Sequence, residues 1–263
     1  MKVACIQLSS GEDYLKNFKN IIKYIHEAID ENSDLIITPE TSSIITNDKK
    51  ILYANTYTMK KDPLIKEIKK ISKKFKKWIL IGSVPIKDGK KFRNRSIMIN
   101  PRGKVEKYYD KISMFDVKLN NKETHKESKT FKPGSKIVSV NLPWGRLGLT
   151  ICFDLRFPEI YRNLSKKKLN FISVPSAFTK ITGQKHWLTL LKARAIENFC
   201  FIFAPNQTGK NTNKRETYGH SVIISPDGNI LKIKKSGVGV IYKKINPKIS
   251  MDLRKIIPSL SSN

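Results

Sequence analysis

Three side chains of complementary chemistry, Glu40, Lys111 and Cys152, each lie at the end of a segment that is typical of a strand. A thiol can attack a carbonyl carbon and hold the acyl group as a thioester. A carboxylate can take the thiol proton, pass it to a leaving amine and then activate water. An ammonium group can stabilise the oxyanion, together with a backbone N–H such as that of Phe153. If their strands are neighbours, the trio predicts hydrolysis through a covalent thioester.

The segment around Cys152, taken alone, is open to two interpretations. An apolar run ends in this cysteine, and a Pro-Glu pair follows at 158–159, which is typical of a strand that leads through a turn into a helix. There, backbone N–H groups and the positive end of the helix are expected to lower the thiol pKa and favour the thiolate. The alternative is an inert core cysteine, since free cysteines are among the most buried residues. Glu40 and Lys111 have an equally plain alternative, because charged residues at strand ends often only contact solvent.

Apolar periodicity predicts an α/β fold around these residues. Apolar positions three and four apart predict helices over residues 13–30, 63–76, 159–167 and 184–198. Short apolar runs bounded by turn residues predict strands over residues 3–8, 34–38, 78–84, 95–100, 104–109, 137–140, 147–152, 171–174, 199–204, 218–224, 230–234 and 237–242. Alternating helices and strands, with some hairpins, predict mixed sheets covered by helices. This is an α/β sandwich, expected to form one domain over residues 1–263.

The charge of the chain raises a second class of function. Lys and Arg number 51 against 22 Asp and Glu, which gives a formal net charge of +29. Such an excess is typical of nucleic-acid-binding proteins. The lysines are, however, spread over many segments and form no single arm with interleaved aromatic residues, which favours a compositional bias and solvated faces. The excess can still attract anionic small molecules.

The remaining composition predicts the compartment. Three scattered cysteines offer neither a disulfide framework nor a zinc site, and they suit a reducing cytoplasm. Cys5 and Cys200 lie inside apolar strands and are expected to be core residues. No apolar run approaches the length of a membrane span, and the N-terminus does not resemble a signal peptide. We therefore expect a cytoplasmic protein without a membrane partner.

Several blocks of the sequence together resemble the nitrilase superfamily of carbon–nitrogen hydrolases. The similarity covers residues 1 to about 260 in the family's order of motifs. The blocks are Pro39-Glu40, Tyr109 to Asp116, Glu127-Ser128 with Pro133-Gly134, Cys152 to Glu159, Pro175 to Phe178 with Thr182-Gly183, His186-Trp187, Arg194 to Asn198, and Tyr218 to Ser221. The resemblance implies a four-layer α-β-β-α sandwich, usually assembled as a homodimer or larger homo-oligomer, with no metal or cofactor required.

The resemblance also implies roles for individual residues. The family's catalytic Glu, Lys and Cys fall on Glu40, Lys111 and Cys152, and its second glutamate falls on Glu127. Glu127 lies in the polar stretch 117–135, which we predict to be a loop that can cover a site. Ser113 departs from the histidine that relatives often carry, while the lysine is kept.

Within the superfamily, the blocks resemble the Nit-type amidases, which act on deaminated glutathione and on ω-amides of 2-oxo acids. The expected reactants are a small anionic amide and water, and N-carbamoyl amides or nitriles are the alternatives. We predict that Phe153, Arg156, Phe178 and Thr182 contact the substrate. Arg156 suits a substrate carboxylate through its bidentate fork, although an internal ion pair with Glu159 explains it equally well.

Overall fold

Two six-stranded mixed sheets form the centre of the structure, a computed structural model that describes residues 1–118, 124–213 and 215–260. The first sheet contains, in spatial order, β16 (Gly239–Lys244), β1 (Lys2–Gln7), β2 (Leu35–Ile37), β3 (Trp78–Asp88), β4 (Lys91–Ile99) and β5 (Val105–Asp110). The second contains β15 (Ile230–Lys234), β14 (Ser221–Ile224), β11 (Phe201–Ala204), β10 (Phe171–Ser173), β9 (Gly145–Leu149) and β8 (Val138–Leu142). Both combine parallel and antiparallel pairs, so the predicted mixed sheets are confirmed.

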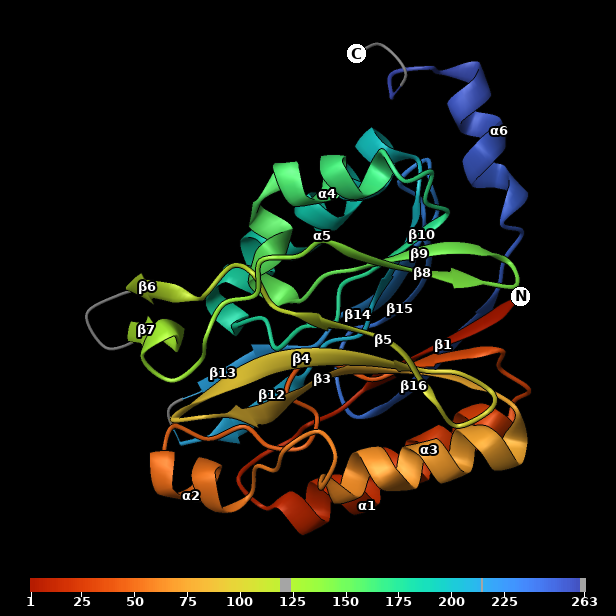
Figure 1. The fold of residues 1–263 in the computed structure, drawn as a ribbon. Helices are drawn as coiled ribbons and strands as arrows, with labels where there is room; N and C mark the ends of the chain where they lie inside the picture. The colour runs from red at the N-terminus through yellow and green to blue at the C-terminus, as the bar shows by residue number, and fades with distance from the viewer. Residues whose placement is uncertain (119–123, 214, 261–263) are drawn as a thin grey trace.

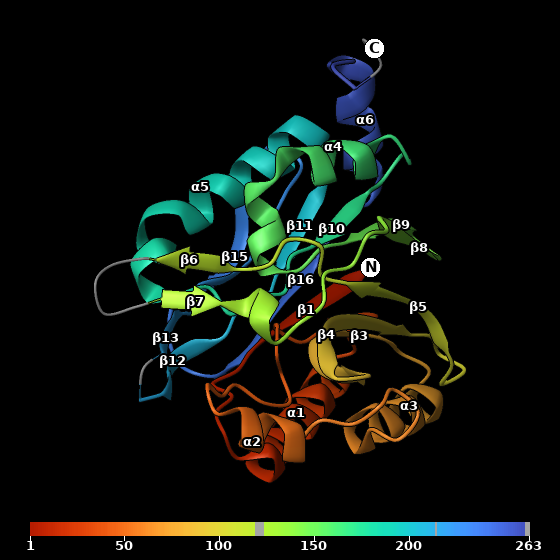
Figure 2. The same cartoon turned by 60° about the vertical axis from the view of Figure 1, so that its left-hand side comes forward.

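Helices cover the outer face of each sheet and complete a four-layer sandwich (Figures 1 and 2). Helices α1 (Tyr14–Asp30) and α3 (Pro63–Phe75) lie on the first sheet, and α4 (Pro158–Ser165) and α5 (Lys180–Asn198) lie on the second. The predicted α-β-β-α order of layers is therefore observed. In the described part of the chain, no helix is both long enough and apolar enough to cross a membrane.

Strand β1 shows how the sequence builds two cores at once. Successive side chains of a strand point to opposite faces of the sheet. Val3 and Cys5 belong to the core between the two sheets, whereas Ala4 and Ile6 pack in the core beneath α1 and α3. Cys5 and Cys200 are both fully buried, which confirms them as core residues.

The strand directions bring the candidate residues to one edge of the sandwich. Strands β2 and β3 are parallel, β4 is antiparallel to β3, and β5 is antiparallel to β4, so β5 runs in the same direction as β2. The carboxyl ends of β2 and β5, which precede Glu40 and Lys111, therefore meet at the same edge of the first sheet. Cys152 follows the carboxyl end of β9, which is parallel to β10 in the facing sheet.

The predicted loop over residues 117–135 is only partly correct. A short hairpin of β6 (Asp116–Lys118) and β7 (Thr124–Lys126) lies there, followed by the 3₁₀ helix η1 (Glu127–Lys129), while 119–123 fall outside the described residues. Other elements that the sequence did not predict are α2 (Lys49–Ala54), α6 (Lys248–Ile256), β12 (Thr208–Thr212) and β13 (Arg215–Tyr218). All of these are short or strongly polar, so they lack the apolar periodicity on which such predictions depend.

Candidate active site

Cys152 opens a tight turn directly after β9. It is the first residue of the 3₁₀ helix η2 (Cys152–Arg156), and its backbone N–H donates to the carbonyl oxygen of Pro175 at 3.0 Å. Its φ angle of 46° lies in the left-handed region, which costs a non-glycine residue roughly 1–2 kcal/mol. Strain of this kind persists only where the surrounding structure holds it in place, and it is found most often at functional sites.

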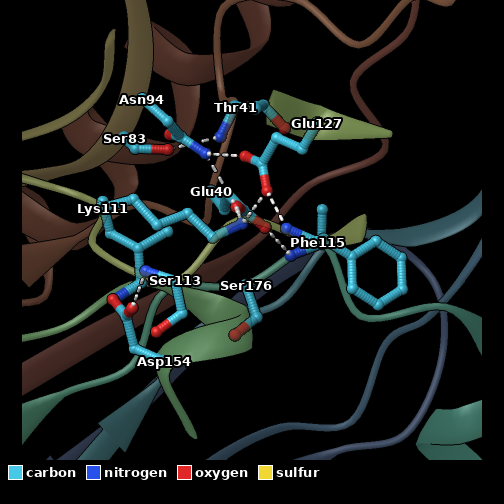
Figure 3. A network of polar contacts seen from close by, with 12 residues as sticks. Glu40, Thr41, Ser83, Asn94, Lys111, Ser113, Phe115, Glu127, Asp154 and Ser176 are labelled. Carbon is cyan, nitrogen blue, oxygen red and sulfur yellow. Dashed lines mark hydrogen bonds and ion pairs between the residues drawn. The ribbon is translucent and has the colours of Figure 1, made fainter. Parts of the chain in front are cut away.

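Thr41, the residue after Glu40, has a similar backbone conformation. Its φ is 49°, which is a genuine outlier for a β-branched side chain. The Thr41 N–H donates to Ser83 Oγ at 2.8 Å, which fixes the turn that carries Glu40 (Figure 3). The carboxylate and the thiol therefore both lie beside strained turns at strand ends.

Asp154 ties the turn of Cys152 to the segment that carries Lys111. Its buried carboxylate accepts hydrogen bonds from Ile151 N at 2.9 Å and from the Tyr109 hydroxyl at 2.7 Å. Its other oxygen accepts from Ser113 N at 2.9 Å (Figure 3). The residue at position 113 makes this contact through its backbone, so the contact does not depend on whether the side chain is serine or histidine. The two strand ends are held at a defined separation.

Lys111 links two carboxylates in the interior (Figure 3). Its Nζ lies 3.0 Å from Glu40 Oε1 and 2.8 Å from Glu127 Oε2. The side chains of Lys111 and Glu40 are 2% and 3% exposed, and that of Glu127 is 13% exposed. Buried charges of this kind persist only when they are paired and hydrogen-bonded.

Neutral donors complete the hydrogen bonding of both carboxylates. Asn94 Nδ2 donates to Glu40 Oε1 at 2.9 Å and to Glu127 Oε1 at 3.2 Å. The backbone N–H of Ala177 donates to Glu40 Oε2 at 2.8 Å, and that of Phe115 donates to Glu127 Oε2 at 2.7 Å. Each carboxylate is consequently held by both of its oxygens, which fixes its orientation.

The charges of this cluster control its protonation. Burial opposes the ionisation of Glu40, but Lys111 and Arg215 outweigh it and hold the pKa of Glu40 below its ordinary value. Burial likewise opposes the charge of Lys111, but Glu127 and Glu40 outweigh it and raise the pKa of Lys111. An ionised carboxylate and a protonated amine therefore coexist at neutral pH.

The pKa of Cys152 moves in the direction opposite to the one expected from the sequence. Burial raises the thiol pKa, the adjacent Glu40 carboxylate raises it further, and Lys111 only partly offsets these effects. The expected helix dipole is also missing, because a single 3₁₀ turn follows Cys152 and α4 begins only at Pro158. The prediction that this turn lowers the thiol pKa and favours the thiolate is wrong. Cys152 is a neutral thiol beside a carboxylate that can accept its proton.

A cavity of about 240 Å³ brings these groups together. It is lined by seven of the predicted site residues: Glu40, Lys111, Glu127, Cys152, Phe153, Phe178 and Thr182. The rings of Phe115 and Phe153 pack edge to face with their centroids 5.0 Å apart, and they form part of the apolar wall of the cavity. Within the described residues, no group of three or more His, Cys, Asp or Glu side chains is arranged to hold a metal ion.

Arg156 is the one predicted site residue that does not line this cavity. Its Nη2 lies 3.2 Å from His186 Nδ1, and its guanidinium stacks over Phe178 at 5.4 Å. Among the described residues it forms no ion pair with Glu159 or another carboxylate. Arg156 therefore packs against Phe153 and Phe178, which line the cavity, and does not line it itself.

Sequence reasoning missed three polar residues of the site: Asn94, Asp154 and Arg215. Asn94 lies in β4, in a stretch that was not predicted as strand, and it is 1% exposed. Asp154 is fully buried two residues after the thiol, and Arg215 opens the unpredicted strand β13. A polar residue between apolar neighbours was the available signal for Asp154. Nothing in the local pattern around Arg215 indicated that it would line the cavity.

Comparisons with known proteins agree with this geometry. The sequence matches the family model described as carbon–nitrogen hydrolase over residues 2–254. It is 35% identical over 268 residues to the deaminated glutathione amidase of Yersinia enterocolitica, covering 99% of this chain and 92% of that protein. It is 30% identical over 265 residues to omega-amidase NIT3 of Saccharomyces cerevisiae, covering 98% and 91%.

Solved structures agree as well. The crystal structure of the Caenorhabditis elegans NitFhit protein matches with a TM-score of 0.92 and 31% identity, covering 100% of this chain and 64% of that longer one. The structure of Saccharomyces cerevisiae Nit3 matches with a TM-score of 0.87 and 27% identity, covering 98% of this chain and 94% of that one. The resemblance seen in the sequence motifs is confirmed. This chain belongs to the carbon–nitrogen hydrolase family.

Proposed function

We propose that this protein hydrolyses the C–N bond of a small linear amide through a thioester on Cys152. The observation that carries the proposal is the meeting of Glu40, Lys111 and Cys152 on the wall of one cavity, with the ammonium 3.0 Å from the carboxylate. Family membership and the amidase relatives support C–N hydrolysis over the nucleic-acid interpretation of the net charge.

The first half of the reaction forms the thioester. Glu40 takes the proton of the Cys152 thiol as the sulfur attacks the amide carbon. The oxyanion that forms accepts hydrogen bonds from Lys111 Nζ and from the Phe153 backbone N–H, which lies in the first turn of η2, where such groups have no partner in the helix. The C–N bond then breaks as Glu40 returns its proton to the nitrogen, and the amine or ammonia leaves.

The second half releases the acid. Glu40 takes a proton from water, and the resulting hydroxide attacks the thioester carbon. The C–S bond breaks, the sulfur recovers a proton from Glu40, and the carboxylic acid departs. Glu127 does not enter these proton transfers; it holds Lys111 at 2.8 Å and keeps the ammonium aimed at the oxyanion.

The relatives suggest the class of substrate. Two are named for deaminated glutathione and for ω-amides, so we propose an anionic amide whose acyl chain fits the cavity. The test is release of ammonia or amine from a panel of linear amides, N-carbamoyl amides and nitriles. Amides should be turned over and nitriles should not, and Cys152→Ala should abolish the activity. Turnover that survives Cys152→Ala removes the thioester mechanism.

The predicted assembly and location belong to the same proposal. We expect a homodimer or larger homo-oligomer, as the family resemblance implies, and a location in the cytoplasm, which suits three scattered cysteines. Light scattering of the purified protein measures the first, and fractionation of cells measures the second. A monomer that is fully active contradicts the proposed assembly and leaves the proposed reaction mechanism unaffected.

A further inference from the structure

Gln207 is a buried residue that joins the two sheets beside the active site. It follows shortly after β11 of the second sheet and is fully buried. Its side chain reaches the segments that follow β1 and β2 of the first sheet. There Nε2 donates to the backbone carbonyl oxygen of Glu40 at 3.0 Å and to Ser10 Oγ at 3.1 Å. Oε1 accepts from the backbone N–H of Ser10 at 2.9 Å, so both polar atoms of this amide have partners that fix its position.

The backbone of Gln207 is tied to the other side of the same site. Its N–H donates to the carbonyl oxygen of Ser176 at 2.9 Å. The next residue, Ala177, donates its N–H to Glu40 Oε2 at 2.8 Å. Gln207 therefore holds the backbone of Glu40 directly and holds the donor to its carboxylate through one intervening residue. These contacts form a closed ring, in which the position of the base depends on Gln207.

The segment over residues 175–177 also holds the nucleophile. The carbonyl oxygen of Pro175 accepts the backbone N–H of Cys152 at 3.0 Å. The Glu40 carboxylate raises the pKa of the Cys152 thiol, which places the two groups close together. A shift of Glu40 relative to residues 175–177 is consequently a shift of the base relative to the thiol.

The turn that carries Glu40 needs support from outside. Thr41 has a φ of 49°, and strain of this kind persists only where the surroundings hold it. Gln207 holds the carbonyl at the start of this turn. Ser10, which Gln207 fixes, donates from Oγ to the carbonyl oxygen of Ser42 at 2.8 Å and so holds the following part. Gln207 and Ser10 thus act as one support for the turn.

Gln207 does not line the cavity, so it has no contact with a substrate bound there. Its neutral amide binds the backbone of Glu40 and not the carboxylate. The pKa of Glu40 is set by burial and by nearby charges, of which Lys111 is the strongest. Position and protonation of the base are therefore controlled by different residues.

We infer that Gln207 is a positioning residue that sets the separation between the Glu40 carboxylate and the Cys152 thiol, by tying the backbone of Glu40 to residues 175–177. The inference rests on the proposed role of Glu40 as the base and adds the residue that aligns it. Because proton transfer depends on this alignment and substrate binding does not, the loss of Gln207 lowers kcat and leaves KM nearly unchanged.

Gln207→Met tests this split, because methionine has nearly the same length and lacks the hydrogen bonds. A misplacement of about 1 Å can cost roughly 100-fold in rate, so kcat for glutaramate should fall roughly 10- to 100-fold. KM should change less than about twofold. A wild-type kcat, or a change confined to KM, overturns the inference.

Gln7→Met is the matched control for a structural defect. Gln7 is also fully buried; its Nε2 donates to the carbonyl oxygen of Gly237 at 2.8 Å, and its Oε1 accepts from Ser221 N at 2.8 Å. It does not line the cavity. Both variants leave buried groups without partners, so both should lower Tm. Only Gln207→Met should lower kcat, and an equal kcat in the two variants overturns the inference.

A milder variant covers the case in which Gln207→Met does not fold. Ser10→Ala removes the oxygen that accepts from Gln207 Nε2 and that donates to Ser42, while Gln207 keeps its bond to Glu40. The kcat should fall roughly 3- to 10-fold with KM unchanged, as the loss of one buried hydrogen bond allows. A wild-type kcat in Ser10→Ala contradicts the shared support.

Labelling of the thiol keeps the inference distinct from the proposed reaction, because it needs no amide substrate. Methyl methanethiosulfonate transfers its SCH3 group to the Cys152 sulfur, methanesulfinate leaves, and the thiol proton passes to Glu40. The labelling rate of the Cys152 peptide, followed by mass spectrometry, should fall at least about 10-fold in Gln207→Met and stay at the wild-type rate in Gln7→Met. Equal rates in the wild type and Gln207→Met overturn the inference. A wild type that hydrolyses no amide but shows the expected labelling removes the proposed function alone.

Discussion

Replacing Lys111 by methionine tests whether the buried charge cluster is held as described. The variant removes two charge-assisted hydrogen bonds, at 3.0 Å to Glu40 and 2.8 Å to Glu127. Removing one partner of a buried ion pair typically costs about 3–5 kcal/mol. Glu40 can avoid an unpaired buried charge by taking up a proton. Keeping a carboxyl group with an ordinary pKa of about 4.3 protonated costs about 1.4 kcal/mol for each pH unit above that pKa, or about 3.7 kcal/mol at pH 7. We expect the free energy of unfolding to fall by about 3–4 kcal/mol at pH 7.

The pH dependence of that loss has a definite sign. In the wild type the pKa of Glu40 is lowered, so its contribution to stability is present above its ordinary pKa and is lost as the pH falls through the folded-state pKa. In Lys111→Met, burial acts without the ammonium and raises the pKa of Glu40, so proton uptake becomes easier on acidification. The difference in stability between the two proteins should therefore shrink to about 1 kcal/mol at pH 5.

Urea unfolding followed by tryptophan fluorescence measures both values. The matched control is Lys180→Met, which removes an ion pair of nearly equal length, 2.9 Å, between half-exposed side chains. That change should cost less than about 1 kcal/mol at either pH. The reasoning is refuted if Lys111→Met is as stable as the control, or if its deficit is the same at pH 5 as at pH 7. Its kcat should also fall by at least about 100-fold, since an oxyanion donor is lost.

Three further changes test other parts of the site. Asn94→Asp places a third carboxylate beside Glu40 and Glu127, so the pKa of Glu40 should rise. The acidic limb of the pH profile of kcat/KM should then move to higher pH, and a limb at the wild-type pH would contradict the contact between Asn94 and Glu40. In Gly82→Ala, the new Cβ would lie 1.8 Å from the carbonyl oxygen of Thr38, so the turn before Glu40 must shift; wild-type kcat and Tm would contradict this. Raising the ionic strength should lower kcat/KM for the anionic amide succinamate and not for the neutral amide butyramide, because salt screens Lys49 and Lys126, two exposed lysines that line the cavity. Equal responses of the two substrates would argue against electrostatic attraction.

The candidate triad could be predicted because its members follow strand ends. Apolar runs located β2 and β9, and the hairpin turn at residues 101–103 located β5. Glu40, Lys111 and Cys152 follow soon after the ends of these strands. Local pattern does not reveal which strands run side by side or in which direction. The family resemblance implied only that the three residues share one site, and the strand order and directions come from the structure.

The supporting residues could not be predicted, because their importance depends on distant contacts. Asn94 matters because β4 places it against Glu40, 54 residues away in the sequence. Arg215 lies on the cavity wall, where it donates a hydrogen bond to the carbonyl oxygen of Ala177, 38 residues away in the sequence. The predicted direction of the Cys152 pKa shift is wrong for the same reason. The sequence shows a turn after the thiol, but it does not show the burial and the facing Glu40 carboxylate that raise the pKa. Such effects depend on packing between the two sheets.

The most direct test of the central claim is the mass of the peptide that contains Cys152 after acid quenching during turnover of glutaramate. The account predicts that this peptide gains the mass of the acyl group with loss of one hydrogen, that the adduct disappears as substrate is exhausted, and that Cys152→Ala shows none. An enzyme that turns over the amide without this adduct, or with the acyl group on Cys5 or Cys200, would contradict the thioester mechanism.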